Sequence, residues 1–86
     1  MPIISAFFGI IIRMYFDDHE PRHFHAEHQG QNATFDFSGR LLTGKIRSAT
    51  ARKLIREWAR AHETELEENW KRAKRLQPLN QVAPLE

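Results

Sequence analysis

The hydrophobic pattern of the chain changes its period at Ser48, and this change constrains the fold more than any other feature. Apolar and polar residues alternate in residues 9–16, 23–28 and 33–37, which is the pattern of strands with one buried face. Beyond Ser48, apolar side chains recur at helical spacing: Ala51, Leu54, Ile55, Trp58, His62, Leu66, Trp70 and Ala73. Because both apolar surfaces need a partner, we expect an α+β fold in which a small antiparallel sheet packs against helices.

The expected sheet occupies about residues 3–46 and has three to four strands. Its main strands are the alternating segments, and the first of them has one apolar face: Ile10, Ile12, Met14 and Phe16. Residues 3–8, which precede a bend at Gly9, and residues 41–43 are the candidates for further short strands.

Two helices are expected, at about residues 48–61 and 64–76. Ser48 is a suitable N-cap for the first helix. One unbroken helix would be roughly 42 Å long at about 1.5 Å per residue, whereas a compact domain of this size is only about 30 Å across. We therefore expect a break between them, where Thr64 and Glu67 have the spacing of a capping box for the second helix.

The chain of 86 residues suffices for one domain with one core, followed by an irregular tail at residues 77–86. It contains no cysteine, which excludes disulfides and thiolate zinc sites. The longest apolar run, residues 3–12, is too short to span a bilayer and has none of the features of a signal peptide. We expect a cytoplasmic protein without a membrane partner.

The polar side chains of the first two alternating segments are expected on one face of a hairpin. A register that pairs Phe16 with Phe24 and Met14 with Ala26 keeps the core face apolar. The same register places three polar pairs on the opposite face: Arg13 with Glu27, Tyr15 with His25, and Asp17 with His23.

Two kinds of chemistry suit this polar face. His23 and His25 lie on the same side of a strand and can reach a single divalent metal ion. Asp17, Asp18, His19 or Glu27 can complete the ligand shell, and Asp17 is the preferred third ligand. Alternatively, the imidazoles act as general acid and base beside a carboxylate, and Arg13 stabilises a developing anion, as in phosphodiester cleavage. Ordinary solvent-exposed polar surface is the third interpretation.

The positive charge is concentrated in the second half of the chain. Residues 1–44 carry three basic and five acidic side chains, and residues 45–86 carry ten and six. Four basic residues lie together opposite the apolar stripe of the first helix: Arg52, Lys53, Arg56 and Arg60. This face is a candidate contact for nucleic acid or an acidic protein partner, and a solvated helix surface is the alternative. His62, which belongs to the apolar stripe, is expected to be a structural residue.

The segment at residues 9–16, followed by Asp18-His19-x-Pro21-x-His23-Phe24-His25-Ala26, resembles the signature of a family of small bacterial proteins, domain of unknown function 4160. The segments around Trp58 and Trp70 resemble the helical half of that family. The resemblance implies a functional role for five positions: Arg13, Asp18, His19, His23 and His25. It also implies one half of a two-protein module, in which some relatives are regarded as toxins paired with a small antitoxin-like protein.

The sequence is therefore consistent with three alternative functions. The first is a toxin component of a type II toxin–antitoxin module that acts on nucleic acid or translation through the histidine-rich hairpin face. The second is a non-catalytic protein-interaction module that depends on a divalent metal ion. The third is a structural domain whose exposed sheet face has no further role.

Overall fold

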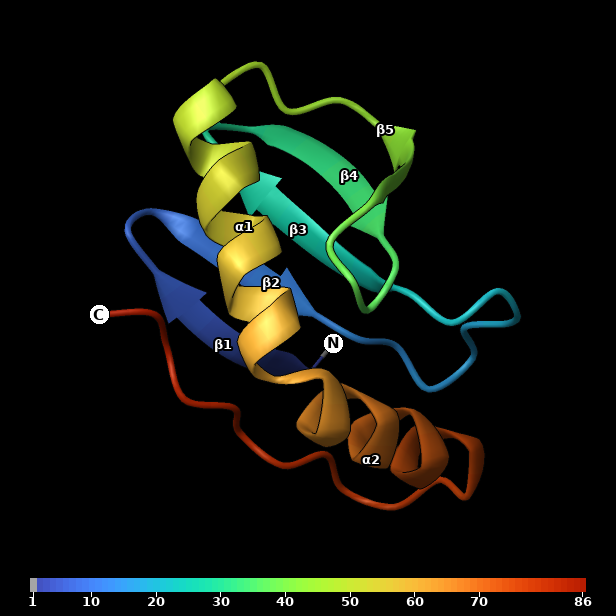
Figure 1. Cartoon of the computed structure of the whole chain (residues 1–86). Helices are drawn as coiled ribbons and strands as arrows, with labels where there is room; N and C mark the ends of the chain where they lie inside the picture. The colour runs from blue at the N-terminus through green and yellow to red at the C-terminus, as the bar shows by residue number, and fades with distance from the viewer. Residues whose placement is uncertain (1) are drawn as a thin grey trace.

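The computed structural model describes residues 2–86 as an antiparallel sheet followed by two helices (Figure 1). The strands are β1 (Ile3–Phe7), β2 (Ile10–Arg13), β3 (Phe24–His28), β4 (Gln31–Phe35) and β5 (Leu41–Gly44), and the helices are α1 (Ala49–Ala61) and α2 (Glu63–Lys74). The five strands lie side by side in chain order, each antiparallel to the next. The α+β fold expected from the sequence is confirmed, with five strands rather than three to four.

Two tight turns make consecutive strands neighbours in the sheet. Phe8-Gly9 joins β1 to β2, and Gln29-Gly30 joins β3 to β4, with positive φ at both residues of each turn. This is the conformation of two-residue turns whose twist matches the twist of the flanking strands.

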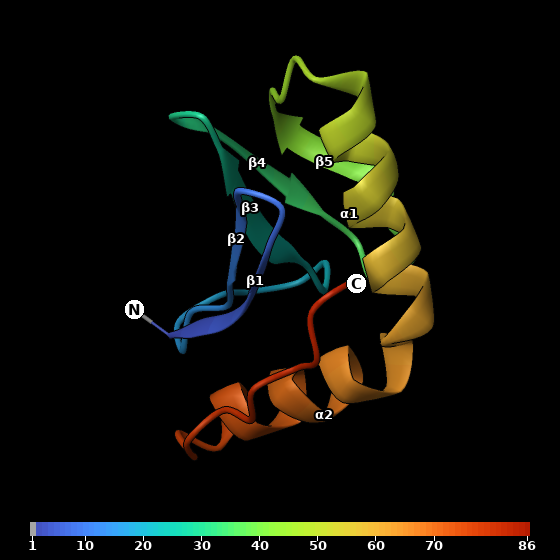
Figure 2. The same ribbon diagram turned by 90° about the vertical axis from the view of Figure 1, so that its left-hand side faces the viewer.

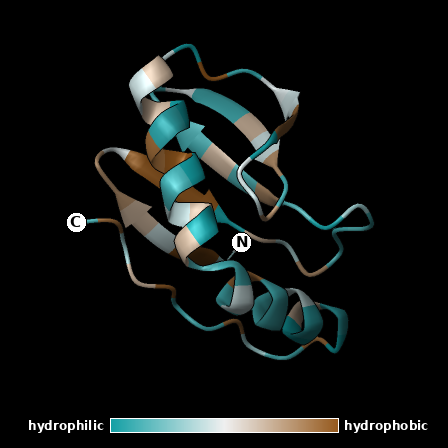
Figure 3. Cartoon of the chain, in the orientation of Figure 1, coloured by the Kyte–Doolittle hydropathy of each residue, from teal (hydrophilic) through white to brown (hydrophobic). Residues whose placement is uncertain are grey.

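The core lies between one face of the sheet and the helices: α1 covers that face and α2 closes the core at one end of the sheet (Figure 2). Trp58 of α1 is fully buried and contacts Phe24 and Phe7, with ring centroids 5.4 Å and 5.6 Å apart. The ribbon of β2 that passes behind α1 is coloured as hydrophobic, and much of both helices is coloured as hydrophilic (Figure 3). The predicted packing of the apolar stripe on the apolar sheet face is confirmed.

The register between β2 and β3 differs from the predicted one by two residues. Ile12 pairs with Ala26, and Arg13 pairs with His25. The cause is that β2 ends at Arg13 and the chain turns soon afterwards, so Phe16 is 38% exposed instead of facing the core. Because side chains alternate with a period of two, a shift of two residues leaves the side chains within β2 and β3 on their predicted faces, and Phe16 beyond the end of β2 is the exception.

The helices break at the predicted place but for a different local reason. Ser48 caps α1 as expected, since its Oγ accepts a hydrogen bond from the backbone N–H of Ala51 at 3.0 Å. The second helix begins at Glu63 with His62 as its cap residue, so the capping box predicted at Thr64 does not form. The whole molecule extends 34 Å along its longest axis, which is too short for a continuous helix over both segments.

The C-terminal tail has no regular structure, as expected, but it packs against the domain. Val82 is buried and donates its backbone N–H to the carbonyl of Ile4 at 2.7 Å. The Asn69 side chain of α2 makes two hydrogen bonds with the backbone of Asn80. The tail therefore covers the free edge of β1 (Figure 1). In residues 2–86, neither helix has the length and apolar composition needed to cross a membrane.

Candidate metal centre on the outer sheet face

The candidate site begins at the turn that follows β2. Phe16 and Asp17 occupy the tip of this turn and are exposed. The backbone N–H of Asp18 donates to the carbonyl of Tyr15 at 3.3 Å, and the Asp18 Oδ2 accepts from the N–H of Tyr15 at 3.0 Å. Asp18 is therefore folded back toward the sheet while its neighbour Asp17 points away.

Asp18, His23 and His25 converge on one point, and we call them the Asp18 cluster. The Oδ1 atom of Asp18 lies 3.1 Å from Nε2 of His25 and 3.4 Å from Nε2 of His23. One potential ligand atom from each residue lies within 4.8 Å of the others. The side chains of Asp18 and His23 are only 12% and 13% exposed, so water screens this cluster weakly.

The hydrogen bonds behind the cluster orient its ligand atoms. Nδ1 of His23 lies 2.7 Å from the carbonyl oxygen of Pro21. Because a carbonyl can only accept, Nδ1 must carry the hydrogen, and in the neutral ring this leaves the lone pair of Nε2 facing Asp18. Histidines that bind metals commonly donate their other ring N–H to a backbone carbonyl or a carboxylate in this way.

The distances within the cluster suit a transition-metal ion. Zinc lies about 2.0–2.2 Å from nitrogen and oxygen ligands, so neighbouring ligand atoms of a tetrahedral or octahedral site are roughly 3.0–3.4 Å apart. The two separations from Asp18 Oδ1, 3.1 Å and 3.4 Å, fall in this range. Two imidazoles and one carboxylate form a donor set suited to zinc, iron, nickel or manganese.

The sequence identified both histidines of the cluster and included Asp18 among the candidate ligands, but it preferred a different carboxylate. Asp17, the predicted third ligand, lies at the exposed turn tip, and Asp18 takes its place beside His23 and His25. The cause is the turn itself, because its geometry returns the fourth residue rather than the third to the sheet.

The other predicted residues surround the cluster without joining it. Arg13 lies opposite His25 on β3, but its guanidinium donates to Oε1 of Glu27 at 2.7 Å. The Tyr15 ring contacts the His25 ring edge-on, with centroids 4.5 Å apart. His19 lies outside the metal-ligand set, with Nδ1 3.1 Å from the carbonyl of Glu20.

A hollow of about 250 Å³ adjoins the cluster on the outer face of the sheet. We call it the histidine hollow, and it is lined by His19, Pro21, His23, Thr34, Leu42 and Thr43. Its lining explains the position of His19, which faces the hollow beside His23. A metal ion in the Asp18 cluster would thus have a space for a further ligand next to it.

Two contacts from α2 hold the loop that carries Asp18, and the sequence pattern did not indicate either of them. The Trp70 ring lies edge-on to the His23 ring at a centroid distance of 5.6 Å. Lys74 donates from Nζ to the backbone carbonyl of Asp18 and also lies over the Trp70 ring. Helical periodicity places Trp70 on the buried face of α2, but no local signal shows that it reaches a histidine 47 positions earlier in the chain.

The four basic residues predicted to lie together on α1 do not all line the same surface. Arg52, Arg56 and Arg60 line a second hollow, on the helix side of β5, together with the loop that follows β4. Lys53 is exposed and does not line this hollow. Arg40, from the loop, was not among the predicted basic residues and also lines it.

The fold and the cluster define the chain as a small α+β protein with a potential metal centre on the outer sheet face. Residues 9–71 match the family model described as Domain of unknown function (DUF4160). The chain therefore belongs to this family, and the match contains the Asp18 cluster and the arginines of α1. No curated protein and no solved structure gives a significant match to the chain.

Proposed function

We propose that Asp18, His23 and His25 bind a divalent transition-metal ion. We further propose that the protein is the toxin component of a two-protein module in the cytoplasm and acts through this metal centre. The observation that carries the proposal is the convergence of three ligand atoms beside an open hollow. A structural zinc site is closed by four protein ligands, whereas a catalytic site keeps a position for water or substrate. Three converging ligands and an adjacent hollow resemble the second arrangement.

The proposed chemistry is hydrolysis of a phosphodiester in nucleic acid. A bound divalent ion lowers the pKa of its water and neutralises charge on a phosphoryl oxygen. His19 faces the hollow beside His23, where an imidazole can accept a proton from the attacking water. The roles of His23 and His25 are to hold the ion, and that of Asp18 is to hold it and to compensate its charge.

Metal binding is tested by titrating the purified protein with Zn²⁺, Mn²⁺ and Ni²⁺ in a calorimeter. We expect near-stoichiometric binding of at least one ion, and Asp18→Asn should weaken it by at least tenfold. Asp17→Asn is the matched control because it removes the same charge one residue away, at the exposed turn tip. Equal losses in the two variants, or no binding to the wild type, would contradict the proposed centre.

Toxicity is tested by inducible expression in a bacterial host without the neighbouring gene. The wild type should arrest growth, and His25→Ala should abolish the arrest without unfolding the protein. His28→Ala, on the same strand but outside the cluster, should retain it. Harmless expression of a folded, metal-loaded wild-type protein would reject the toxin role.

A metal-dependent interaction module is the second candidate, and the exposed edge of β5 favours it. Leu41 and Leu42 are 44% and 36% exposed on this strand, and an unpaired edge can accept a strand from a partner protein. The partner would be a small antitoxin-like protein encoded nearby. Metal binding without growth arrest, combined with metal-dependent capture of that neighbour, would select this function over the first.

A further inference from the structure

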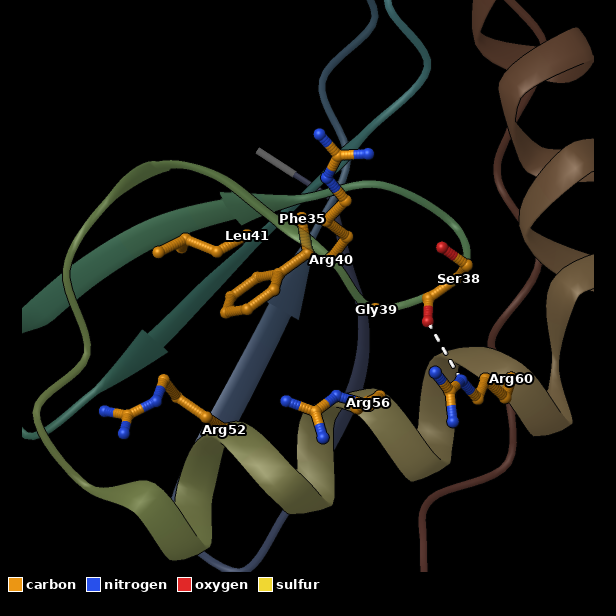
Figure 4. Close-up of a pocket in the computed structure, with 8 residues that line it drawn as sticks. All are labelled: Phe35, Ser38, Gly39, Arg40, Leu41, Arg52, Arg56 and Arg60. Carbon is orange, nitrogen blue, oxygen red and sulfur yellow. Dashed lines mark hydrogen bonds between the residues drawn. The ribbon is translucent and has the colours of Figure 1, made fainter.

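The second hollow is a concave site of about 390 Å³ between α1 and the loop that joins β4 to β5. We call it the arginine hollow, and its polar lining comes from Arg52, Arg56 and Arg60 on one side and Ser38, Gly39 and Arg40 on the other. Figure 4 shows Arg56 between Arg52 and Arg60 along the helix, and Arg40 extending away from the helix at the rim. The volume lies at the small end of the range of ligand pockets.

The loop side of the hollow is held in place by Asp36. Its Oδ1 atom accepts hydrogen bonds from the N–H of Ser38 at 3.0 Å, the hydroxyl of Ser38 at 2.7 Å and the N–H of Arg40 at 2.9 Å. Burial alone would raise the pKa of this carboxyl, but these hydrogen bonds and the charge of Arg40 lower the pKa below 3.8. Asp36 is therefore ionised near neutral pH, and the loop is ordered before any ligand arrives.

The loop also packs directly on α1. A Cβ atom at Gly39 would lie 2.6 Å from Cα of Arg56, so the loop approaches the helix as closely as a glycine allows. The carbonyl of Ser38 accepts a hydrogen bond from Nε of Arg60 at 3.3 Å. These two contacts fix the width of the hollow.

Asp36, which interacts with the charge of Arg40, compensates the positive charge of the hollow only in part. In the part of the chain that the structure describes, direct ion pairs involve Arg13, Arg22 and Arg72 but none of the arginines that line the hollow. Arg52 is instead positioned by the backbone carbonyls of Ile46 and Arg47. Several like charges around one concavity repel one another, and a bound anion relieves this repulsion.

The arginine side chains suit an oxyanion, and the concave shape favours a compact phosphate group. The planar guanidinium groups match the oxygens of a phosphate and can donate two hydrogen bonds each. A hollow of about 390 Å³ admits a compact tetrahedral group with its sugar. Leu41 also lines the hollow and is 44% exposed, which provides apolar surface for a sugar or a base.

The two hollows lie on opposite sides of one edge strand. Leu41 lines the arginine hollow, and the next residue, Leu42, lines the histidine hollow. The pairing of β5 with β4 has a register shift between Thr34 and Phe35 at this point, and Leu41 and Leu42 line different hollows. A flexible polymer that passes around the edge of β5 can therefore contact both hollows.

We propose that the arginine hollow binds a backbone phosphate of a nucleic-acid strand whose neighbouring segment reaches the histidine hollow. The choice of nucleic acid rests on the function proposed above, whereas the phosphate site rests on the hollow alone. The arginine hollow is then the anchor for the substrate, and the Asp18 cluster is the centre that acts on it.

The test measures fluorescence anisotropy of a short labelled single-stranded RNA with the full-length protein in EDTA. Arg56→Gln keeps the aliphatic stem that contacts Gly39 and removes the charge, so folding should be retained. We expect it to weaken binding by roughly tenfold, the loss of one charge-assisted contact, and to lower the salt dependence by about 0.7 in slope. Lys53→Gln removes the same charge from the same helix outside the hollow and should have a much smaller effect.

Parallel titrations with DNA of the same sequence and with inorganic phosphate distinguish the sources of the phosphate group. Competition by RNA or DNA at concentrations where inorganic phosphate fails supports the proposal. Equal losses in Arg56→Gln and Lys53→Gln would overturn it, as would displacement by inorganic phosphate alone, or an Arg56→Gln defect limited to binding of a protein partner.

Because the binding assay contains EDTA, it measures RNA binding without a bound metal ion and is independent of the metal titration. Loss of RNA binding in Arg56→Gln together with a failed metal titration would retain the phosphate site and reject the proposed function. Normal metal binding together with no RNA or DNA binding would retain the metal centre and reject the phosphate site.

Discussion

Replacing Gly39 by alanine tests the close packing of the loop on α1. Two costs are expected. The residue has a φ of +89°, and an alanine in this left-handed region costs about 1–2 kcal/mol. The added Cβ would also lie 2.6 Å from Cα and 2.8 Å from Cγ of Arg56, and relieving such overpacking costs roughly 1–3 kcal/mol. The free energy of unfolding should therefore fall by about 2–5 kcal/mol.

Gly9 and Gly30 provide controls that share the first cost and lack the second. Their φ values are +77° and +78°, and a Cβ at either position meets nothing within 4 Å. Alanine at either position should cost only about 1–2 kcal/mol. Since about 1 kcal/mol shifts the Tm of a domain this size by roughly 4–8 °C, thermal unfolding followed by circular dichroism separates the two outcomes.

Gly39→Ala should also weaken RNA binding, because the displaced loop widens the arginine hollow, whereas Gly9→Ala should not. The reasoning is refuted if Gly39→Ala is no more destabilising than Gly9→Ala, within about 0.5 kcal/mol. That result would mean that the loop yields without disturbing α1.

Two further predictions concern side chains that hold loops and the tail. Asp36→Ala should lower the free energy of unfolding by about 1 kcal/mol near neutral pH, because three hydrogen bonds to a partly exposed carboxylate are lost. Because the folded pKa of Asp36 is lowered from 3.8, the stabilisation by its carboxylate is complete above that value and is lost as the pH falls through the folded pKa. Urea unfolding of the wild type and Asp36→Ala at several pH values should therefore show that the difference in unfolding free energy disappears in acid. A difference that is independent of pH would contradict this prediction. Asn69→Ala removes a fully buried side chain and both of its bonds to Asn80, at a cost of about 2–3 kcal/mol. Hydrogen exchange should then show faster exchange in the tail, and unchanged tail protection would count against a role in tail docking.

The fold was predictable wherever the spacing of apolar residues kept one period over several helical turns or several strands. The helical stripe and the alternating segments contained enough positions to determine α1, α2 and the main strands. Residues 3–7 were harder, because they form a nearly continuous apolar run in which period alone cannot decide the structure. The left-handed turn at Phe8 and Gly9 makes them a separate strand.

The register and the third ligand depended on interactions that periodicity does not encode. Both follow from the turn after β2, which is stabilised by the Asp18 side chain and the backbone of Tyr15. His23 and His25 were predictable as a pair because residues two apart share one face of a strand. Trp70 and Leu42 reach the site from distant elements, and only the tertiary packing brings them there.

The tail on β1 leaves the sheet with two unequal edges. The backbone N–H of Val82 donates to the carbonyl of Ile4, so this part of β1 is hindered from pairing with another chain. In the sheet that the structure describes, β5 pairs with β4 on one side and its other edge has no neighbouring strand. A sheet that can be extended at both edges can polymerise without limit. With one edge blocked, pairing of β5 with β5 of a second copy would use up both reactive edges and close as a two-fold dimer. Removal of residues 77–86 is therefore expected to expose the backbone of β1, so that both edges of the sheet could pair with other chains.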